Sequence, residues 1–326
     1  MVGRALMRRF VVRRLLGLVP LLFGISVVIF SLIHTAPGGP TAVYALSPDF
    51  TPQQQAEIER SLGLDRPLPV QYLVWVSGML AGSWGHSYKD GRDVRDVVLE
   101  RMPATLTLMG TAYALSLMIA VPIGVFTATR PRSAARYVVN VLTLLGISVP
   151  TFWTGLLAIM IFSAKLGWMP SGGMYTIGAP FSLLDRLRHL VMPALVLAAV
   201  NLAMWARYVH SSLIEVLQED YVRTARAKGL AERVVIFRHA LRNTLLVVVT
   251  LLGLSLPGLF SGALVTEAIF SWAGNGRLII ESLLGRNYPV LIANFMILAV
   301  LAVLGNLAAD IAYAFVDPRI RVGARS

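Results

Sequence analysis

The sequence predicts an all-α integral membrane protein with six transmembrane helices, and three observations support this fold class. The mean hydropathy is +0.69 and only 14% of the 326 residues are charged, whereas soluble domains carry about 25% charged residues. Six apolar stretches contain no charged residue, and five of them reach about 20 residues, enough for a helix to cross the bilayer core. Lys and Arg residues gather in alternate connections between these stretches, as in membrane proteins generally.

The predicted spans are residues 15–35, 104–129, 137–164, 190–206, 244–266 and 290–309. None of them has the polar face that a helix at the surface of a soluble domain shows. The fourth is the shortest and extends past Arg207, whose long side chain carries its charge to the membrane surface. The first is longer than the apolar region of a signal peptide, and "HTAPGGP" is a poor cleavage site, so we expect it to remain as a span.

The distribution of charge predicts that both termini are cytoplasmic. With this orientation the cytoplasmic segments carry 17 Lys or Arg residues and five acidic residues, while the outside segments carry 11 of each. The net charge of +12 therefore lies on the cytoplasmic side, as the positive-inside rule expects. Membrane topology explains the basic charge, and no nucleic-acid partner is expected.

The first outside connection contains two predicted helical pieces. "TPQQQAEIERSLG" has a helix-capping Thr51 at its start and Gly63 at its end. "VQYLVWVSGMLAG" carries Tyr72 and Trp75, aromatic residues of the kind that lie at the level of lipid headgroups. This second piece is either a lid on the membrane surface or a platform for an external partner.

The cytoplasmic connection at residues 211–243, called the elbow below, is predicted to fold. Apolar and small residues keep a helical spacing from Ser212 to Lys228. Gly229 permits the left-handed conformation that ends a helix, and Leu230 follows at the position of the accompanying apolar contact. A second short helix is expected over residues 231–241. A solvated loop is the alternative, but a loop of this length with caps and helical periodicity indicates a folded face for a partner.

The elbow also carries a family resemblance. "DYVRTARAKGL" followed by "RHALRN" resembles the cytoplasmic signature of binding-protein-dependent ATP-binding cassette (ABC) importer permeases of the oligopeptide/dipeptide/nickel group. "RRLLGLVPLLFGISVVIFSLIHTAPGGP", "LGLDRPLPVQYLVWVSGMLAGSWGHSY" and "DIAYAFVDPRIR" are similar to other parts of that group, so the resemblance covers nearly the whole chain. It implies the type I importer architecture and the first of two paralogous permease subunits.

Some positions depart from the family pattern. The general signature is E-A-A-x-x-x-G, and here Arg223 stands at the Glu position and Thr224 at the first Ala, as is typical of the peptide subgroup. Gly39 replaces the acid of a more usual Gly-Asp-Pro, and Ala273 replaces the proline of Trp-Pro-Gly. Both of these lie in predicted outside segments, where they would affect docking of an external partner.

The resemblance implies a division of the chain and a docking role for the elbow. Residues 1–35 form a basic segment and the first span, 36–103 an extracytoplasmic segment, 104–316 the core permease domain and 317–326 a cytoplasmic tail. In this family the elbow is the coupling helix and lodges in a groove of an ATP-binding subunit. The residues expected to form this docking site are Asp220, Tyr221, Arg223, Thr224, Ala225, Arg226, Lys228, Gly229 and Leu230.

The same resemblance implies the partners. They are a second permease subunit, two ATP-binding subunits that hold ATP and Mg, an external substrate-binding protein, and membrane lipid. This chain has no G-x-x-x-x-G-K-[ST] loop, so it is not expected to bind ATP, a cofactor or a metal, or to act as an enzyme. The expected location is the cytoplasmic (inner) membrane of a prokaryote.

Peptides are the leading substrate, and nickel chelates, glutathione or another small solute are the alternatives. An ion-gradient-driven transporter would need acidic or other ionisable residues near the middle of its spans for an ion relay, and none of the six predicted spans has one there. An intramembrane enzyme would need a nucleophile with its base, or a set of metal ligands, at membrane depth, and His34 at the end of a span is too little. Arg207 and Asp310, close to spans, either line the translocation path, pair across helices, or extend to the membrane surface.

Overall fold

The computed structural model describes residues 2–35, 53, 57, 59–60, 63–130, 132–134, 137, 139, 141, 149–245, 248 and 264–316, without the side chains of 2–11, 33 and 308–316. The chain divides into two compact units. Unit 1 comprises Met1–Thr105 with Ala273–Leu304, and unit 2 comprises Leu106–Trp272 with Gly305–Ser326. The long helices α4 and α12 contribute to both.

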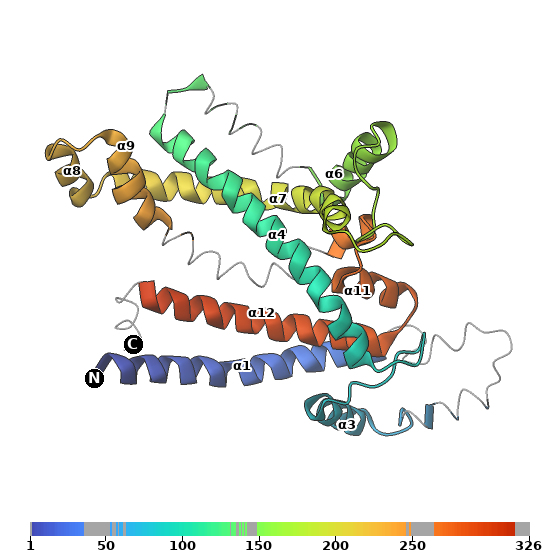
Figure 1. The fold of residues 1–326 in the computed structure, drawn as a ribbon. Coiled ribbons are helices and arrows are strands. Elements are labelled where there is room, and N and C mark those ends of the chain that lie inside the picture. Colours follow the sequence, from blue (N-terminus) through green and yellow to red (C-terminus); the bar gives the residue numbers. More distant parts are fainter. Residues whose placement is uncertain are drawn as a thin grey trace. The chain divides into compact units, whose positions relative to one another are not determined.

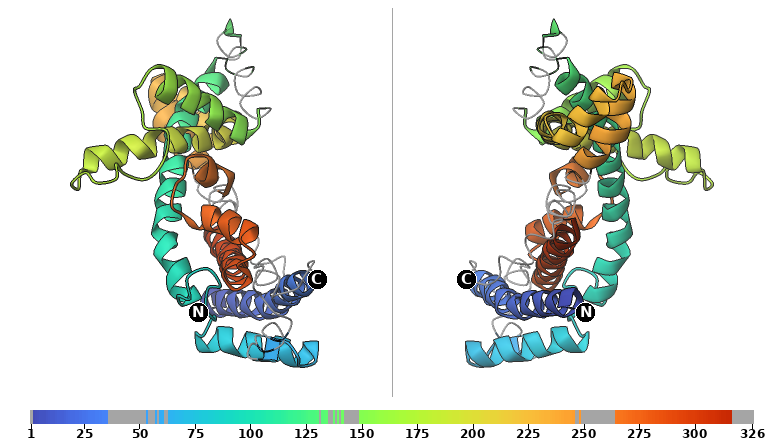
Figure 2. Two further views of the ribbon diagram at one scale, coloured as in Figure 1. Left: turned by 90° about the vertical axis from the view of Figure 1, so that its right-hand side faces the viewer. Right: turned by 90° about the vertical axis from the view of Figure 1, so that its left-hand side faces the viewer.

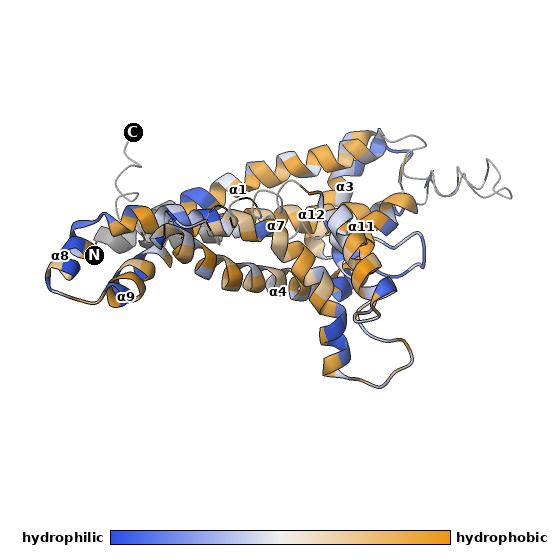
Figure 3. Ribbon diagram, turned by 90° about the horizontal axis from the view of Figure 1, so that it is seen from above, coloured by the Kyte–Doolittle hydropathy of each residue, from blue (hydrophilic) through white to orange (hydrophobic). Residues whose placement is uncertain are grey.

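The described residues are mostly helical, which confirms the all-α fold class. Apart from one isolated bridge between His86 and Asp93, this part of the chain contains no β-structure. Four helices are long and apolar enough to cross a membrane: α1 (Val2–His34), α4 (Val94–Thr129), α7 (Leu183–Leu217) and α12 (Tyr288–Val316) (Figure 1). They contain the first, second, fourth and sixth predicted spans, and Figure 3 shows their largely hydrophobic surfaces.

The third predicted span is not one continuous helix, and the fifth lies largely outside the described residues. Residues 149–150 interrupt the apolar run 137–164, and Pro150, in an extended conformation (φ −59°, ψ 136°), precedes α6 (Thr151–Ala158). Proline disfavours helix in the residue before it, which explains the interruption. A π-helical segment, Ile159–Lys165, follows α6. Most of run 244–266 lies outside the described residues, so six spans and the orientation of the termini remain predictions.

In unit 1, α3 (Leu68–Ala81) packs across the second half of α1 rather than alongside it, as Figures 1 and 2 show from perpendicular directions. The ring of Phe30 lies 5.5 Å from that of Tyr72 and 5.8 Å from that of Trp75. The hydroxyls of Ser26 and Tyr72 are 2.7 Å apart. The aromatic residues of α3 thus pack on the end of α1, and the expected location of this piece at the membrane surface stays a prediction. Whether it acts as lid or platform is untested.

The predicted short helix before α3 ends where expected. Gly63 has φ +68°, and the amide of Leu64 donates to Glu59 O at 2.8 Å. The proposed cap Thr51 lies outside the described residues. After α3, residues 83–93 are fixed to the start of α12 by Asn287, whose Oδ1 accepts from the Tyr88 amide at 3.0 Å and whose Nδ2 donates to Ser87 Oγ at 2.9 Å.

The core of unit 1 joins α4, α11 (Asn275–Leu284) and α12. It lies at the Val94 end of α4, ten residues before the predicted start of the second span. The buried residues of this core are Val94, Val97 and Val98 of α4, Leu278 of α11, and Val290 and Ala293 of α12.

In unit 2, α4 and α7 approach closely at Gly124. A Cβ at this position would lie 2.5 Å from Val209 Cβ and 3.0 Å from Ala206 O, distances that no real side chain occupies. Close approach through a small residue is a common device of membrane helix pairs. Next to it, His210 Nδ1 lies 3.0 Å from Thr127 Oγ1. Gly124 therefore sets the separation of these two helices.

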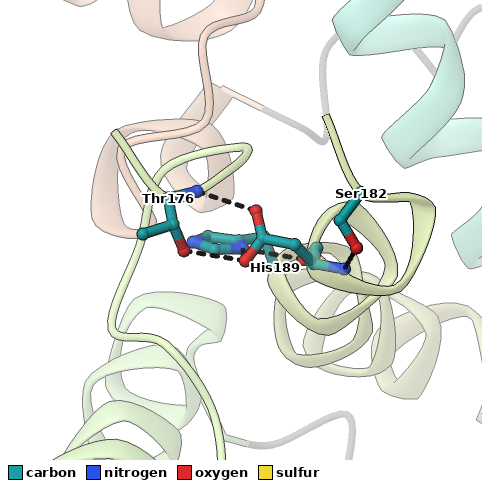
Figure 4. A network of polar contacts seen from close by, with 4 residues as sticks. Thr176, Ser182 and His189 are labelled. Atoms are coloured by element: carbon teal, nitrogen blue, oxygen red, sulfur yellow. Dashed lines mark hydrogen bonds and ion pairs between the residues drawn. The ribbon is translucent and has the colours of Figure 1, made fainter. Parts of the chain in front are cut away.

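The connection before α7 is fixed by Asp185, on the first turn of that helix (Figure 4). Its carboxylate accepts from the Thr176 amide at 2.8 Å and from Thr176 Oγ1 at 2.7 Å. Ser182 Oγ caps the helix by accepting from the Asp185 amide at 3.3 Å. On the other side of this connection, the Gly173 amide donates to Phe270 O at 2.8 Å. These bonds hold the connection against α7 and the residues before α11.

Candidate functional site

The elbow does not continue α7. The expected unbroken helix from Ser212 to Lys228 is wrong: α7 ends at Leu217 and α8 (Asp220–Ala227) begins after a two-residue turn. Glu219 adopts an extended conformation (φ −68°, ψ 146°). Its carbonyl accepts from the amides of Val222 and Arg223, at 3.0 and 3.2 Å. The extended residue thereby starts a new helix in a new direction.

The predicted helix end at Gly229 is confirmed. Gly229 has φ +76°, its amide donates to Arg226 O at 2.9 Å, and the amide of Leu230 donates to Ala225 O at 3.4 Å. These two bonds form the glycine-dependent motif that closes many helices. No other atom lies within 4 Å of the position that a Cβ would take at Gly229, so the requirement for glycine here comes from the backbone conformation alone.

The second arm of the elbow is α9 (Glu232–Val234), which continues directly as a π-helical segment, Val235–Ala240. Its extent matches the predicted helix, but the π-helical geometry was not anticipated. The two arms share a small core. Val222, Ala225 and Val235 are buried there against Val216 and Leu217, the last apolar residues of α7. The elbow is thus a folded unit attached to α7.

An ion pair fixes the angle between the arms. Arg226 Nε and Nη2 donate to Glu232 Oε2 and Oε1 at 3.1 and 2.7 Å, and Nη1 lies 3.5 Å from Leu217 O. The hydrogen bonds from Arg226 lower the pKa of the Glu232 carboxyl, and in return raise the pKa of the guanidinium. Arg226 therefore joins the two arms of the elbow while its side chain stays partly exposed, and its expected role in docking remains a prediction.

The other predicted docking residues fall into three groups: one in the elbow core, one hydrogen-bonded to the α8 backbone, and several exposed to solvent. Ala225 belongs to the elbow core, and Thr224 Oγ1 donates to Asp220 O at 2.9 Å. The exposed Asp220 and Arg223 approach within 3.6 Å. Lys228 is exposed. Arg223 and Lys228 are thus the cations of the signature that remain open to a partner.

Tyr221 ties the two arms together at their far ends. Its hydroxyl accepts from Asn243 Nδ2 at 2.7 Å, across 22 residues of sequence. The side chain of Tyr221 is exposed. It thus has one polar partner inside the elbow and an open ring surface.

Sequence analysis missed an exposed apolar row on the elbow. Leu230, Val234 and Phe237 are 41%, 39% and 55% exposed. Leu230 precedes α9, Val234 ends it, and Phe237 lies in the π-helical segment that follows, whereas Val235 between them is buried. The apolar character of Val234 and Phe237 was readable in the sequence, but their exposure was not. With Tyr221, these side chains give the elbow four exposed apolar or aromatic residues.

The remaining predicted residues are not brought together by the described structure. Arg207 is exposed on α7 and makes no hydrogen bond or ion pair within the described part of the chain. Asp310 lies on α12, but its side chain is outside the described residues, so their pairing stays a prediction. Gly39 also lies outside the described residues. Glu267, which follows the fifth predicted span and was not singled out, is fully buried.

Four long apolar helices in the described residues and a folded basic elbow define a multi-pass membrane protein. Residues 120–322 match the family described as "Binding-protein-dependent transport system inner membrane component", and residues 7–109 match its N-terminal counterpart. The chain belongs to this family. It is therefore a multi-pass inner-membrane transport subunit of the type I ABC permease class, working in a complex with other subunits.

Curated relatives align along almost their full lengths. The chain is 42% identical to the oligopeptide transport system permease protein AppB of Bacillus subtilis over 315 residues, covering 96% of this chain and 99% of the relative. It is 40% identical to the di/tripeptide transport system permease protein DppB of Pseudomonas aeruginosa, covering 97% and 99%. It is 36% identical to the dipeptide transport system permease protein DppB of Escherichia coli K12, again covering 97% and 99%.

Proposed function

We propose that the chain forms, together with a second paralogous permease subunit, the translocation path for peptides in an ABC importer. The names of the full-length relatives support peptide transport, as does the peptide-subgroup form of the signature at Arg223 and Thr224. Two separate ATP-binding subunits bind ATP and Mg and supply the energy. An extracytoplasmic binding protein delivers the solute.

The elbow is the surface on which an ATP-binding subunit docks, and its exposed apolar row carries this proposal. Buried aromatic and aliphatic anchors usually supply most of the affinity of an interface. Leu230, Val234 and Phe237 are exposed together in this chain and are suited to that role. Arg223 and Lys228 border them and supply charge-assisted hydrogen bonds that fix the register.

The packing of the elbow supports a mechanical link to the membrane. Val216 and Leu217 at the end of α7 pack into the elbow core, and Arg226 reaches Leu217 O. A force on the elbow therefore acts on the end of α7 instead of being absorbed by a slack loop. When ATP brings the two ATP-binding subunits together, the docked elbows follow. The α7 helices then change their tilt, which is a rigid-body route to alternating access.

Docking is tested by co-purification in mild detergent. Leu230→Ser with Phe237→Ser removes two apolar anchors, each worth more than about 1 kcal/mol if buried in the interface, so the ATP-binding subunit should be lost at low concentration. Ile177→Ser is the matched control, because Ile177 is 93% exposed on the connection before α7. Undiminished recovery of the ATP-binding subunit with the double variant would refute docking at this surface.

Substrate class is tested separately by uptake in cells. Cells lacking the chain should lose uptake of labelled dipeptides and tripeptides and gain resistance to toxic peptides. Retained peptide uptake, together with lost uptake of a nickel chelate or glutathione, would assign the chain to one of those alternatives.

A further inference from the structure

Unit 1 contains a cavity at the His34 end of α1. Its volume is about 460 Å³. It lies between the end of α1, α3, the residues that follow α3, and the start of α12. Aromatic side chains dominate its walls: Phe30, Trp75, Trp84, Tyr88 and Tyr288. The family signature and the elbow do not involve this cavity.

Among the lining residues that the structure describes, the charged groups are basic. They are Arg60 and Arg66, and no Asp or Glu is in this described set. Neither guanidinium makes a hydrogen bond or ion pair with any described residue. Two arginines at one aromatic-walled cavity, without a carboxylate between them, favour an anion that accepts several hydrogen bonds.

The hydrogen bonds of His34 occupy both of its ring nitrogens. Oε1 of Gln71 lies 2.9 Å from His34 Nε2, and Phe30 O lies 2.8 Å from His34 Nδ1. Gln71 is held in turn, because its Nε2 donates to Leu64 O at 2.9 Å and to Arg66 O at 2.7 Å. His34 and Gln71 therefore fix the cavity wall beside Arg66.

The hydropathy of α1 indicates that the cavity lies near the membrane surface. The apolar stretch Val12–Leu32 of α1 ends just before His34. Helix α3 crosses α1 there, and its Leu73 and Leu80 are exposed. An exposed apolar face on a helix lying along a membrane is suited to the boundary between headgroups and acyl chains. The anionic group most abundant at this level is the phosphate of a phospholipid.

We propose that this cavity binds the headgroup of an anionic phospholipid. Arg60 and Arg66 donate to the phosphate oxygens, while His34 and Gln71 hold the wall of the cavity in place. Trp75 and Phe30 pack against the glycerol and the first acyl carbons. The bound lipid fastens α3 to the end of α1, and this proposal does not depend on which solute is transported.

Native mass spectrometry of the full chain, purified with its accompanying subunits, tests the site. Phosphatidylglycerol and phosphatidylcholine with the same acyl chains are added in parallel. The wild type should retain phosphatidylglycerol preferentially, and Arg60→Gln with Arg66→Gln should weaken that retention at least about tenfold. Arg60→Lys with Arg66→Lys should keep most of it. Arg95→Gln, an exposed arginine of unit 1 outside the cavity, should change nothing.

Four results would overturn the proposal. The first is equal retention by the glutamine double variant and the wild type. The second is a loss of phosphatidylglycerol retention in Arg95→Gln as large as that in the glutamine double variant, which would indicate attraction to surface charge in general. Displacement of the lipid by excess inorganic phosphate would indicate a site for free anions. If the glutamine double variant lost an external binding protein but retained phosphatidylglycerol, the cavity would be a docking site for that protein instead.

Discussion

The guanidinium of Arg226 and the carboxylate of Glu232 form two hydrogen bonds, at 3.1 and 2.7 Å, across the turn that Gly229 closes. The pair joins the two arms of the elbow, and the same arginine reaches the last turn of α7 through Leu217 O. A docking surface that transmits force needs a fixed shape. This ion pair and the small apolar core beneath it give the elbow that shape.

Breaking the pair should weaken energy coupling without abolishing folding. Because both side chains are largely exposed, Arg226→Ala should cost about 0.2–1 kcal/mol of elbow stability. ATP hydrolysis by the assembled complex should continue while solute uptake per ATP falls. The charge exchange Arg226→Glu with Glu232→Arg should recover part of that ratio. Equal uptake per ATP in Arg226→Ala and wild type would show that the pair plays no part in coupling.

The pair also predicts a pH dependence of the elbow. The hydrogen bonds from Arg226 lower the pKa of Glu232 below its ordinary value of 4.5, so the folded elbow favours the ionised carboxylate. Its stabilisation is full above 4.5 and is lost as the pH falls through the lowered pKa. Hydrogen-exchange protection of residues 226–234, corrected for intrinsic rates, should fall below pH 4.5. In Glu232→Gln this step should be missing, and its persistence there would implicate another group.

Gly229 is predicted to be replaceable only by residues that tolerate a left-handed backbone. At φ +76° and with open space around it, Gly229→Ala should destabilise the elbow by about 1 kcal/mol through backbone strain alone. Gly229→Asn should cost less, because asparagine adopts this conformation more readily. Limited proteolysis within residues 226–234 measures the difference. Equal cleavage of the alanine and asparagine variants would show that strain is not the cause.

The separation of α4 and α7 depends on Gly124. Gly124→Ala should push the helices apart and lower the stability of the chain by about 1–3 kcal/mol, because its Cβ would overlap Val209. Gly110→Ala is the matched control on the same helix, since nothing lies within 4 Å of a Cβ there. Thermal unfolding in detergent compares the two. Val209→Gly, which removes both the Cβ and the Cγ1 that the new methyl would overlap, should partly rescue Gly124→Ala. Identical transitions for both glycine variants would contradict the close contact.

The sequence was most informative where a single local rule applies. Charge-free runs of sufficient length located four membrane-crossing helices, and Gly229 and Gly63 marked helix ends that the backbone confirms. These features depend on hydropathy or on one residue's conformational freedom. The exposure of Phe237 was not predicted, because it depends on the π-helical segment in which this residue lies.

Features that depend on tertiary contacts were less predictable. Helical spacing alone continues from α7 into α8, and only the extended backbone at Glu219 reveals the turn. The sequence likewise does not show that Arg226 prefers Glu232 to a partner, because that choice depends on how the two arms fold back. The cavity beside His34 is assembled from residues more than 250 positions apart in the chain, and no local pattern indicates it.

Photo-crosslinking in the assembled, transporting complex tests the docking surface most directly. A photoreactive amino acid in place of Phe237 or Leu230 should crosslink to the ATP-binding subunit, while the same group at Ile177 should not. Crosslinking at Ile177 alone, or no crosslink from either elbow position in a complex that still imports its solute, would contradict the account.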